Sequence, residues 1–162
     1  MKANNGSGNN PDRDVWETPN KIWNTLNKQY LFEFDCCANK DNFKTKDYSN
    51  NFEELTKNDI KGLMCWMNPP FSKANKMFNH FFKVVDYGIA IYRFDNAETK
   101  IWQDIIFQNA DWIFIPKGRV SYHLATDNAN GRNGSRFPSA LIGLGVDTPK
   151  YVDGICLKLK MK

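Results

Sequence analysis

The chain has 162 residues and carries 22 Lys and Arg against 18 Asp and Glu, a formal net charge of +4. With 41% hydrophobic and 25% charged residues, its composition argues against a collagen-like or wholly disordered chain, and its length predicts one domain. No apolar run approaches the ~20 residues of a membrane helix and no signal-peptide core precedes the domain, so we expect a cytoplasmic protein without a membrane partner.

The cysteines lie at positions 36, 37, 65 and 156 and form no C-x-x-C pair. This spacing does not suit structural zinc, so we expect no metal site. Reduced thiols that pack as small apolar groups are the expectation for a cytoplasmic chain.

The N-terminal third begins with a polar leader. Residues 1–13 are rich in Asn, Gly and Ser without apolar periodicity, which predicts disorder ahead of a single domain over 14–162. Thr18 before Pro19 is typical of a helix start, and we expect a helix over 19–29 with Thr18 as its N-cap. The apolar run 31–36 predicts a buried strand with Asp35 at its carboxyl end.

The middle of the chain is less regular. Residues 39–61 predict at most one short strand or helix near 48–56, and the apolar run 63–67 predicts a strand. Asn68-Pro69-Pro70 ends that strand, because proline lacks an N–H and restrains the residue before it. Ser72 is the expected cap of a helix over 73–85 with one apolar stripe.

The C-terminal half predicts further alternation. Asp95 and Glu98 have the spacing of a capping box and predict a helix over 97–109. Strands are expected at 88–92, 112–115, 118–122, 140–144 and 155–159, with a polar loop at 125–136. Strands that alternate with helices in this way predict an α/β fold, a mostly parallel sheet with helices on both faces and mixed strands at its C-terminal end.

The segment Trp66-Met-Asn-Pro-Pro-Phe71 carries the most specific chemistry. A rigid turn after a strand presents the Asn68 side-chain oxygen and the Pro69 carbonyl toward one point beyond the sheet, where open α/β sheets bind ligands. Two convergent acceptors suit a planar amino group and leave its nitrogen lone pair free to attack an electrophilic methyl group. Phe71 is placed to stack on the ring that bears the amine. The alternative interpretation is a proline turn that only connects a strand to a helix.

Four pieces together resemble the phage-type DNA N6-adenine methyltransferases, the Dam family of phage and prophage genomes, within the amino-methyltransferases that carry an Asn/Asp/Ser-Pro-Pro-aromatic motif. The resemblance runs from about Val15 to Gly145. Its pieces, in the family's order, are Trp16-Glu-Thr-Pro19, Phe34-Asp-Cys-Cys-Ala38, Trp66-Met-Asn-Pro-Pro-Phe71, and Lys117-Gly-Arg119 with Phe137-Pro-Ser-Ala140.

The resemblance implies a Rossmann-like sheet and the cofactor S-adenosylmethionine. The cofactor-binding residues that it implies are Thr18, Pro19, Asp35, Cys36, Cys37, Ala38, Asp59 and Asn68. The catalytic loop that it implies is Asn68, Pro69, Pro70 and Phe71. The implied function is methylation of adenine N6 in DNA by direct attack of the amine, in the host cytoplasm if the gene is carried by a phage.

Three departures from the family pattern limit what carries over, and one is that the segment 92–102 matches the family's Arg-x-Asp and Thr-x-x-Trp positions only approximately. The glycine-rich loop of many methyltransferases is absent after Ala38, so the cofactor is held with less backbone at positive φ. A separate target-recognition domain is also absent, so we expect low sequence specificity or help from a second subunit.

DNA contacts are expected at the rims of the site. The basic candidates are Lys73, Lys117, Arg119, Arg132 and Arg136, which would neutralise phosphates, although exposed charges are commonly only solvated. The loop 125–136 is a candidate element for displacing the target base from its stack. Three alternatives stay open: a methyltransferase acting on RNA or on a protein glutamine, a non-catalytic nucleic-acid-binding protein on this scaffold, and a subunit active only as a homo-oligomer.

Overall fold

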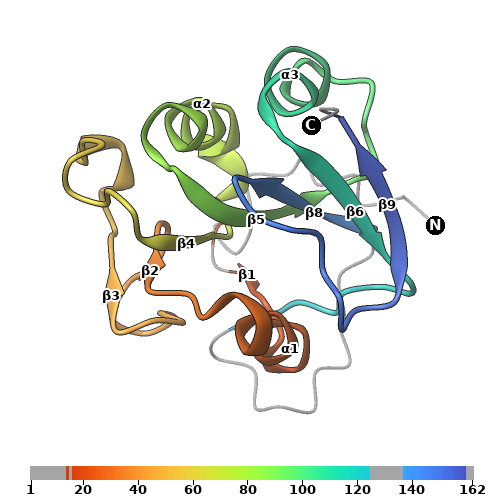
Figure 1. The fold of residues 1–162 in the computed structure, drawn as a ribbon, viewed down its shortest axis with the longest axis horizontal. Helices are drawn as coiled ribbons and strands as arrows, with labels where there is room; N and C mark the ends of the chain where they lie inside the picture. The colour runs from red at the N-terminus through yellow and green to blue at the C-terminus, as the bar shows by residue number, and fades with distance from the viewer. Residues whose placement is uncertain (1–13, 15, 125–136, 160–162) are drawn as a thin grey trace.

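The protein is built on a seven-stranded sheet with the strand order β3-β2-β4-β5-β8-β6-β9 (Figure 1). The computed structural model describes residues 14, 16–124 and 137–159, without the side chains of 123 and 124. The strands are β2 Phe34–Asp35, β3 Asp47–Tyr48, β4 Met64–Met67, β5 Tyr87–Arg93, β6 Trp112–Pro116, β8 Ser139–Leu144 and β9 Gly154–Lys158. Strands β3, β2, β4 and β5 run parallel to one another. Strand β8 is antiparallel to both β5 and β6, and β9 is antiparallel to β6. The prediction of an α/β fold with mixed C-terminal strands is confirmed, but the sheet is not mostly parallel, because three of its six strand pairs among the described residues are antiparallel.

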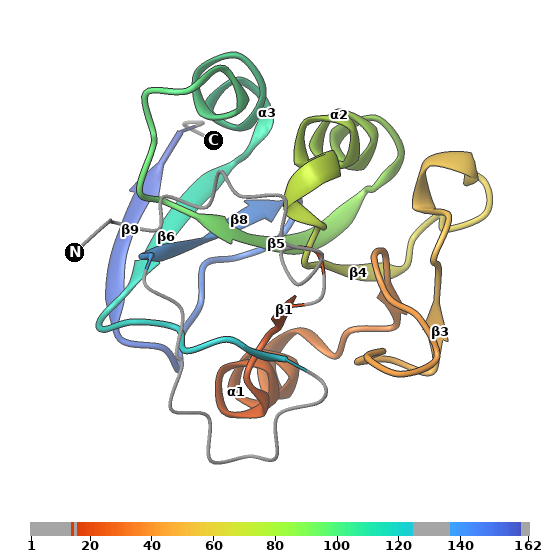
Figure 2. The same ribbon diagram turned by 180° about the vertical axis from the view of Figure 1, so that it is seen from behind.

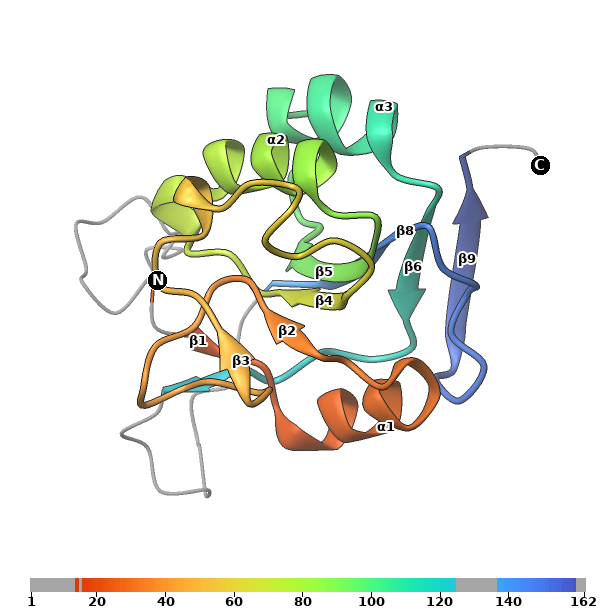
Figure 3. The ribbon, with the colours of Figure 1, turned by 60° about the vertical axis from the view of Figure 1, so that its left-hand side comes forward.

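Helices cover both faces of the sheet, as predicted. Helix α1 (Asn20–Tyr30) lies on one face, and α2 (Ala74–Val84) lies on the other beside the π-helix η4 (Ile101–Ile106) and α3 (Phe107–Asn109). Figures 2 and 3 show these layers from behind and from the side. No helix among the described residues has the length and apolarity needed to cross a membrane.

Side-chain alternation along the strands builds two cores. In β5, Ile89 and Ile91 belong to the apolar cluster that includes Leu26 of α1, whereas Ala90 and Tyr92 belong to the cluster that includes α2 and η4. Because successive strand residues point to opposite faces, one apolar strand supplies both layers. This explains why the central strands read as continuous apolar runs rather than as alternating patterns.

A two-stranded ribbon lies outside the main sheet. Strand β1 (Trp16–Glu17) pairs antiparallel with β7 (His123–Leu124), so that Glu17 lies opposite His123. The sequence did not indicate this pairing, and the strand expected at 118–122 is wrong. That segment is irregular: Gly118 turns it at φ +85°, and Val120 and Tyr122 are buried in the core beside α1.

Two predicted helix caps are wrong because the polar side chains have other surroundings. Helix α1 begins after Pro19, and the hydroxyl of Thr18 is buried without capping it. Helix α2 is preceded by a 3-10 turn, η3 (Phe71–Lys73), and the Ser72 hydroxyl and N–H both donate to the carboxylate of Asp14. Each hydroxyl therefore faces the region where β4 ends rather than a helix end.

The predicted capping box is also wrong. The Asp95 carboxylate accepts two hydrogen bonds from the guanidinium of Arg93, at 2.7 and 2.5 Å, and caps no helix. The helix expected over 97–109 consists instead of η4 and the short α3. Its apolar residues still point inward, because Ile101, Trp102 and Ile106 are buried.

The strand that contains Asp35 is shorter than predicted, and little regular structure follows it. Leu31 ends α1 in the left-handed conformation at φ 54°, so the strand predicted over 31–36 is reduced to β2. The region 48–56 contains the end of β3 and a 3-10 turn, η2 (Phe52–Glu54). Short strands at this end of the sheet leave room for the polar loops that follow them.

Candidate active site

A cavity of about 150 Å³ opens at the carboxyl ends of the three neighbouring parallel strands β3, β2 and β4. Its walls come from the residues that follow these strands and from the segment around β1. The lining includes Asp14, Trp16, Glu17, Thr18, Asp35, Cys36, Cys37, Ala38, Asn39, Asn42, Lys44, Asn50, Phe52, Glu53, Trp66, Asn68, Pro70, Lys73 and Met77. This is the edge where open α/β sheets bind their ligands.

Asp35 is the buried acid of the cavity, with 3% of its surface exposed. Its two carboxylate oxygens accept backbone hydrogen bonds from Cys37 at 3.3 Å and from Lys44 at 3.0 Å. Burial raises the pKa of this carboxyl from 3.8 to about 6, against the lowering effect of both hydrogen bonds and of the Lys44 charge. Asp35 therefore holds both ends of the loop 37–44 while it faces the cavity.

Thr18 contributes a buried hydroxyl without a partner. The residue is 1% exposed, lines the cavity, and its Oγ1 forms no hydrogen bond with the described residues. A buried hydroxyl without a partner is unfavourable by about 1–3 kcal/mol. A ligand in the cavity that hydrogen-bonds Thr18 would remove this cost.

Asn68 follows β4 and is oriented by strand β1. Its Nδ2 donates to the backbone oxygen of Trp16 at 2.8 Å. This bond fixes the amide so that Oδ1 points elsewhere, and Oδ1 accepts no hydrogen bond from the described residues. Because β1 is itself paired with β7, the ribbon positions the amide of the Asn-Pro-Pro turn.

The turn after Asn68 separates the cavity from an aromatic cluster. Pro70 lines the cavity, whereas the ring of Phe71 makes edge contacts with Tyr92 and Phe137, with centroids 5.8 and 5.4 Å apart. The guanidinium of Arg93 lies 5.8 Å from the centroid of Phe71 and 5.1 Å from that of Phe137. The Asn-Pro-Pro-Phe turn thus joins the polar cavity, which Asn68 and Pro70 line, to an aromatic cluster that contains Phe71.

Charged residues that the sequence analysis missed also line the cavity. The Nζ of Lys44 lies 3.7 Å from a carboxylate oxygen of Glu17 and donates to Asn20 at 2.9 Å. Glu53 lies 3.4 Å from Lys76 and 3.9 Å from Lys73, and a hydrogen bond from its own backbone and these lysines lower its pKa. Of these residues, only Glu53 has a sequence signal: it follows β3, one of the parallel strands whose carboxyl ends form the cavity.

The cysteines at the cavity are unreactive thiols. Cys36 is buried, Cys37 is partly buried, and burial raises the pKa of both thiols well above the ordinary value. Both therefore stay protonated at neutral pH, and with Ala38 they contribute shape and backbone to the cavity wall.

The loop that replaces a glycine-rich turn forms without unusual backbone. Among the described residues, positive φ occurs only at Leu31, Gly62, Gly118 and Gly145. The segment 35–44 therefore needs no glycine, because its turn is held by the Asp35 carboxylate instead.

Several of the expected site residues lie away from the cavity. Pro69 is buried, Pro19 lines a second groove on the other side of β1, and Lys117 and Arg119 line that same groove. Asp59 is exposed in a turn and bonds Thr56. Arg132, Arg136 and the loop 125–136 lie outside the described residues, as does the leader 1–13.

Comparison with known proteins agrees with the resemblance seen in the sequence. The model of the family described as DNA N-6-adenine-methyltransferase (Dam) matches residues 6–144. A protein of Haemophilus phage HP1 (strain HP1c1), named DNA N-6-adenine-methyltransferase, is 33% identical over 118 residues, which cover 68% of this chain and 67% of the phage protein. The range 6–144 matched by the family model contains the cavity residues and the Asn-Pro-Pro-Phe turn.

Proposed function

Because the chain belongs to the Dam family of DNA N-6-adenine-methyltransferases, we propose that it transfers a methyl group from S-adenosylmethionine to the N6 amino group of adenine in DNA. The observation that carries the proposal is the position of Asn68. Its nitrogen is held by Trp16 and its oxygen is open, at the boundary between the polar cavity and the aromatic cluster.

The cavity residues suit the proposed cofactor. Thr18 offers a buried hydroxyl without a partner, Asp35 offers a buried carboxylate, and Phe52 and Met77 offer apolar surface. We assign Thr18, Asp35 and the wall formed by 36–38 to cofactor binding. S-adenosylmethionine, when bound, supplies an electrophilic methyl group.

Asn68 is the proposed catalytic residue. Its Oδ1, together with the Pro69 carbonyl, accepts hydrogen bonds from the two N6 hydrogens of the adenine. Such bonds favour a pyramidal amine whose lone pair is free to form the new N–C bond, while the bond between the methyl group and the donor's sulfur breaks and its electron pair stays on the sulfur. The methylated amine then carries a positive charge and loses a proton to water, so no general base is required.

Phe71 and its neighbours are the proposed binding surface for the target base. An adenine that leaves the duplex needs an aromatic surface to replace its stacking partners. Stacking on a side chain contributes about 1–3 kcal/mol per base. The Phe71 ring is held by edge contacts to Tyr92 and Phe137, so its position is set before DNA binds.

We expect low sequence specificity. Within the described residues, every helix and strand belongs to the seven-stranded sheet, its covering layers or the β1–β7 ribbon, and none forms a separate recognition domain. Methylation of a panel of duplexes with permuted sequence around one adenine would measure the specificity.

The direct test is transfer of labelled methyl groups to unmethylated duplex DNA, with separation of the product nucleosides. We expect N6-methyladenine from the wild type and a loss of at least 100-fold from Asn68→Ala, which is about the effect of removing one group that stabilises a transition state. Asn58→Ala, at an exposed turn position, is the matched control and retains activity.

Three results would contradict the proposal in different ways. Full activity of Asn68→Ala would remove the assigned mechanism while leaving the enzyme class intact. Absence of both methyl transfer and S-adenosylmethionine binding by the wild type would favour a non-catalytic nucleic-acid-binding protein on this scaffold. Label found in RNA or in a protein glutamine would change the substrate and keep the chemistry.

A further inference from the structure

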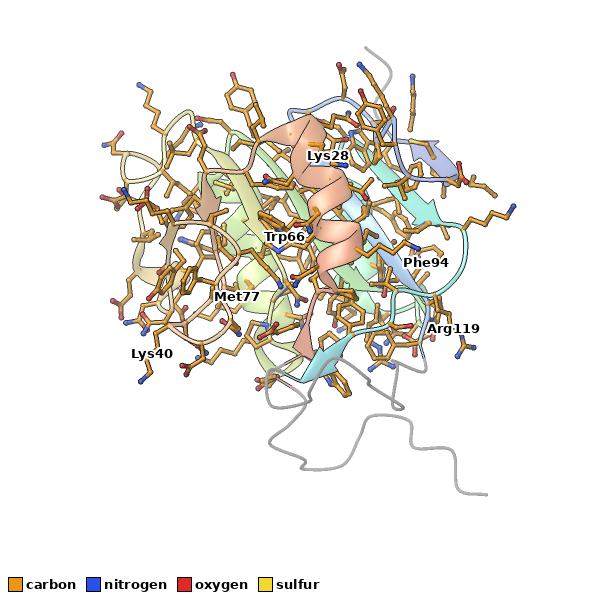
Figure 4. All side chains as sticks on the ribbon, turned by 90° about the horizontal axis from the view of Figure 1, so that it is seen from below. Lys28, Lys40, Trp66, Met77, Phe94 and Arg119 are labelled. Atoms are coloured by element: carbon orange, nitrogen blue, oxygen red, sulfur yellow. The ribbon has the colours of Figure 1, made fainter. Side chains whose placement is uncertain are left out.

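A second concave surface lies on the opposite side of β1 from the cavity. Its walls are the first two turns of α1, the segment 116–121 and the loop 151–153, and they enclose about 500 Å³. Thr18 lines the cavity and the next residue, Pro19, lines this groove. Figure 4 shows the separation: Lys40, next to cavity residue Asn39, and Arg119, which lines the groove, lie on opposite sides of α1. We call this second surface the basic groove.

The basic groove carries unpaired positive charge. Lys21, Lys117 and Arg119 line it and are exposed, and none of the three forms an ion pair with a described residue. Among the described residues that line it, Asp153 is the one acidic residue. The lysines at the cavity differ, because Lys44 is paired with Glu17 and Lys73 lies 3.9 Å from Glu53.

The walls of the groove are fixed by the fold. The N–H of Lys117 donates to the backbone oxygen of Asp153 at 2.7 Å and joins two of the walls. Gly118, at φ +85°, makes a turn that other residues rarely adopt, and Val120 is buried beneath the segment. The cationic side chains therefore extend from an ordered backbone rather than from a free chain end.

The groove is connected to Asn68, the proposed catalytic residue, through the β1–β7 ribbon. The segment 116–121 leads into β7, which pairs with β1, and Trp16 of β1 holds the amide of Asn68. The paired strands β7 and β1 thus link the groove to the Asn-Pro-Pro turn. DNA is the polyanion that the proposed function supplies, and lysine and arginine are its usual backbone partners.

We propose that the basic groove binds the phosphodiester backbone of the DNA substrate outside the reacting base. This inference rests on the proposed function, and it assigns Lys21, which no motif indicated, to DNA binding together with Lys117 and Arg119. It also separates these residues from Lys73, whose charge is partly balanced by Glu53.

The experiment measures the affinity of the full chain for a fluorescent duplex at several salt concentrations. Lys21→Gln, Lys117→Gln and Arg119→Gln are compared with Lys28→Gln, an exposed lysine in the last turn of the same helix α1. Removing one side chain that neutralises a phosphate is expected to reduce the salt slope by about 0.9, which corresponds to about eightfold weaker binding at 0.1 M salt. The melting temperature of each variant checks that the fold is kept.

The expected result is weaker binding and a smaller salt slope for the three groove variants, an unchanged slope for Lys28→Gln, and unchanged affinity for S-adenosylmethionine. Groove variants that bind DNA as Lys28→Gln does would overturn the inference, even if the wild type methylates DNA. The same variants are also titrated with inorganic phosphate. If they lose phosphate binding without any change in DNA binding, the inference is overturned and the groove is assigned to a free anion. A wild type that binds DNA through the groove but transfers no methyl group would contradict only the proposed function.

Discussion

The substitution Asp35→Asn has a predicted effect that changes with pH. In the wild type, burial raises the pKa of this carboxyl from 3.8 to about 6. A shift of this size corresponds to about 3 kcal/mol, because one pKa unit is about 1.4 kcal/mol. Since the folded pKa lies above the unfolded value, the favourable contribution of the neutral carboxyl is fully present below about pH 4 and is lost as the pH rises through 6.

The asparagine removes the charge and also one hydrogen bond. Its amide nitrogen cannot accept, so either the Cys37 N–H or the Lys44 N–H loses its acceptor. An unsatisfied buried donor costs about 1–3 kcal/mol. At pH 4 the variant is therefore less stable than the wild type by about that amount. At pH 7 the removal of the buried charge offsets the loss, and the two proteins have similar free energies of unfolding.

The assay is urea unfolding of both proteins at pH 4, 5, 6 and 7, with the difference in free energy of unfolding taken at each pH. Taking the difference cancels the contributions that the other titrating groups make to the free energy of unfolding. We expect it to change by about 2.4 kcal/mol in favour of the variant between pH 4 and 7. Asp41→Asn, at an exposed position in the same loop, is the control for the substitution itself. A difference that stays constant over this range would refute the assignment of the shift to burial.

Two further predictions concern the other site residues. Thr18→Val removes a buried hydroxyl without a described partner, so we expect the free energy of unfolding of the ligand-free protein to rise by about 1 kcal/mol. Calorimetry should find severalfold weaker binding of S-adenosylmethionine. A loss of stability would show that the hydroxyl has a partner in the protein. Phe71→Leu removes the proposed stacking surface, so kcat/KM for duplex DNA should fall by about 5- to 150-fold with cofactor affinity kept, and unchanged kcat/KM would place the target base elsewhere.

The central strands and the long helix over the sheet could be predicted from the sequence because their signals are local. The apolar run before Asn68 and the stripe that includes Met77, Phe78 and Phe81 determine a strand and a helix wherever they pack. The double proline ends β4 by its own covalent geometry. These features sufficed for the fold class and for the family resemblance that the comparisons then supported.

The helix caps could not be predicted in the same way. Ser72 and Asp95 each have a sequence pattern that is typical of a cap, but Asp14 and Arg93 bind them instead. A cap contributes about 1 kcal/mol, and hydrogen bonds to charged partners compete successfully with it, from Arg93 two residues before Asp95 and from Asp14 far from Ser72 in the chain. The partner of Ser72 is 58 residues away in the chain, so no local pattern indicates it.

The α/β class, the strand ends that carry Asp35 and Asn68, and the turn with its proposed chemistry could be predicted from local patterns, because each depends on residues that are neighbours along the chain. Three other features emerge only when the chain is folded: a backbone oxygen of β1 orients the Asn68 amide, Glu53 lines the cavity, and Pro19, Lys117 and Arg119 line a separate groove with Lys21. These juxtapositions come from strand order and from long-range pairing, whose partners lie tens of residues apart and leave no periodic signal in the sequence.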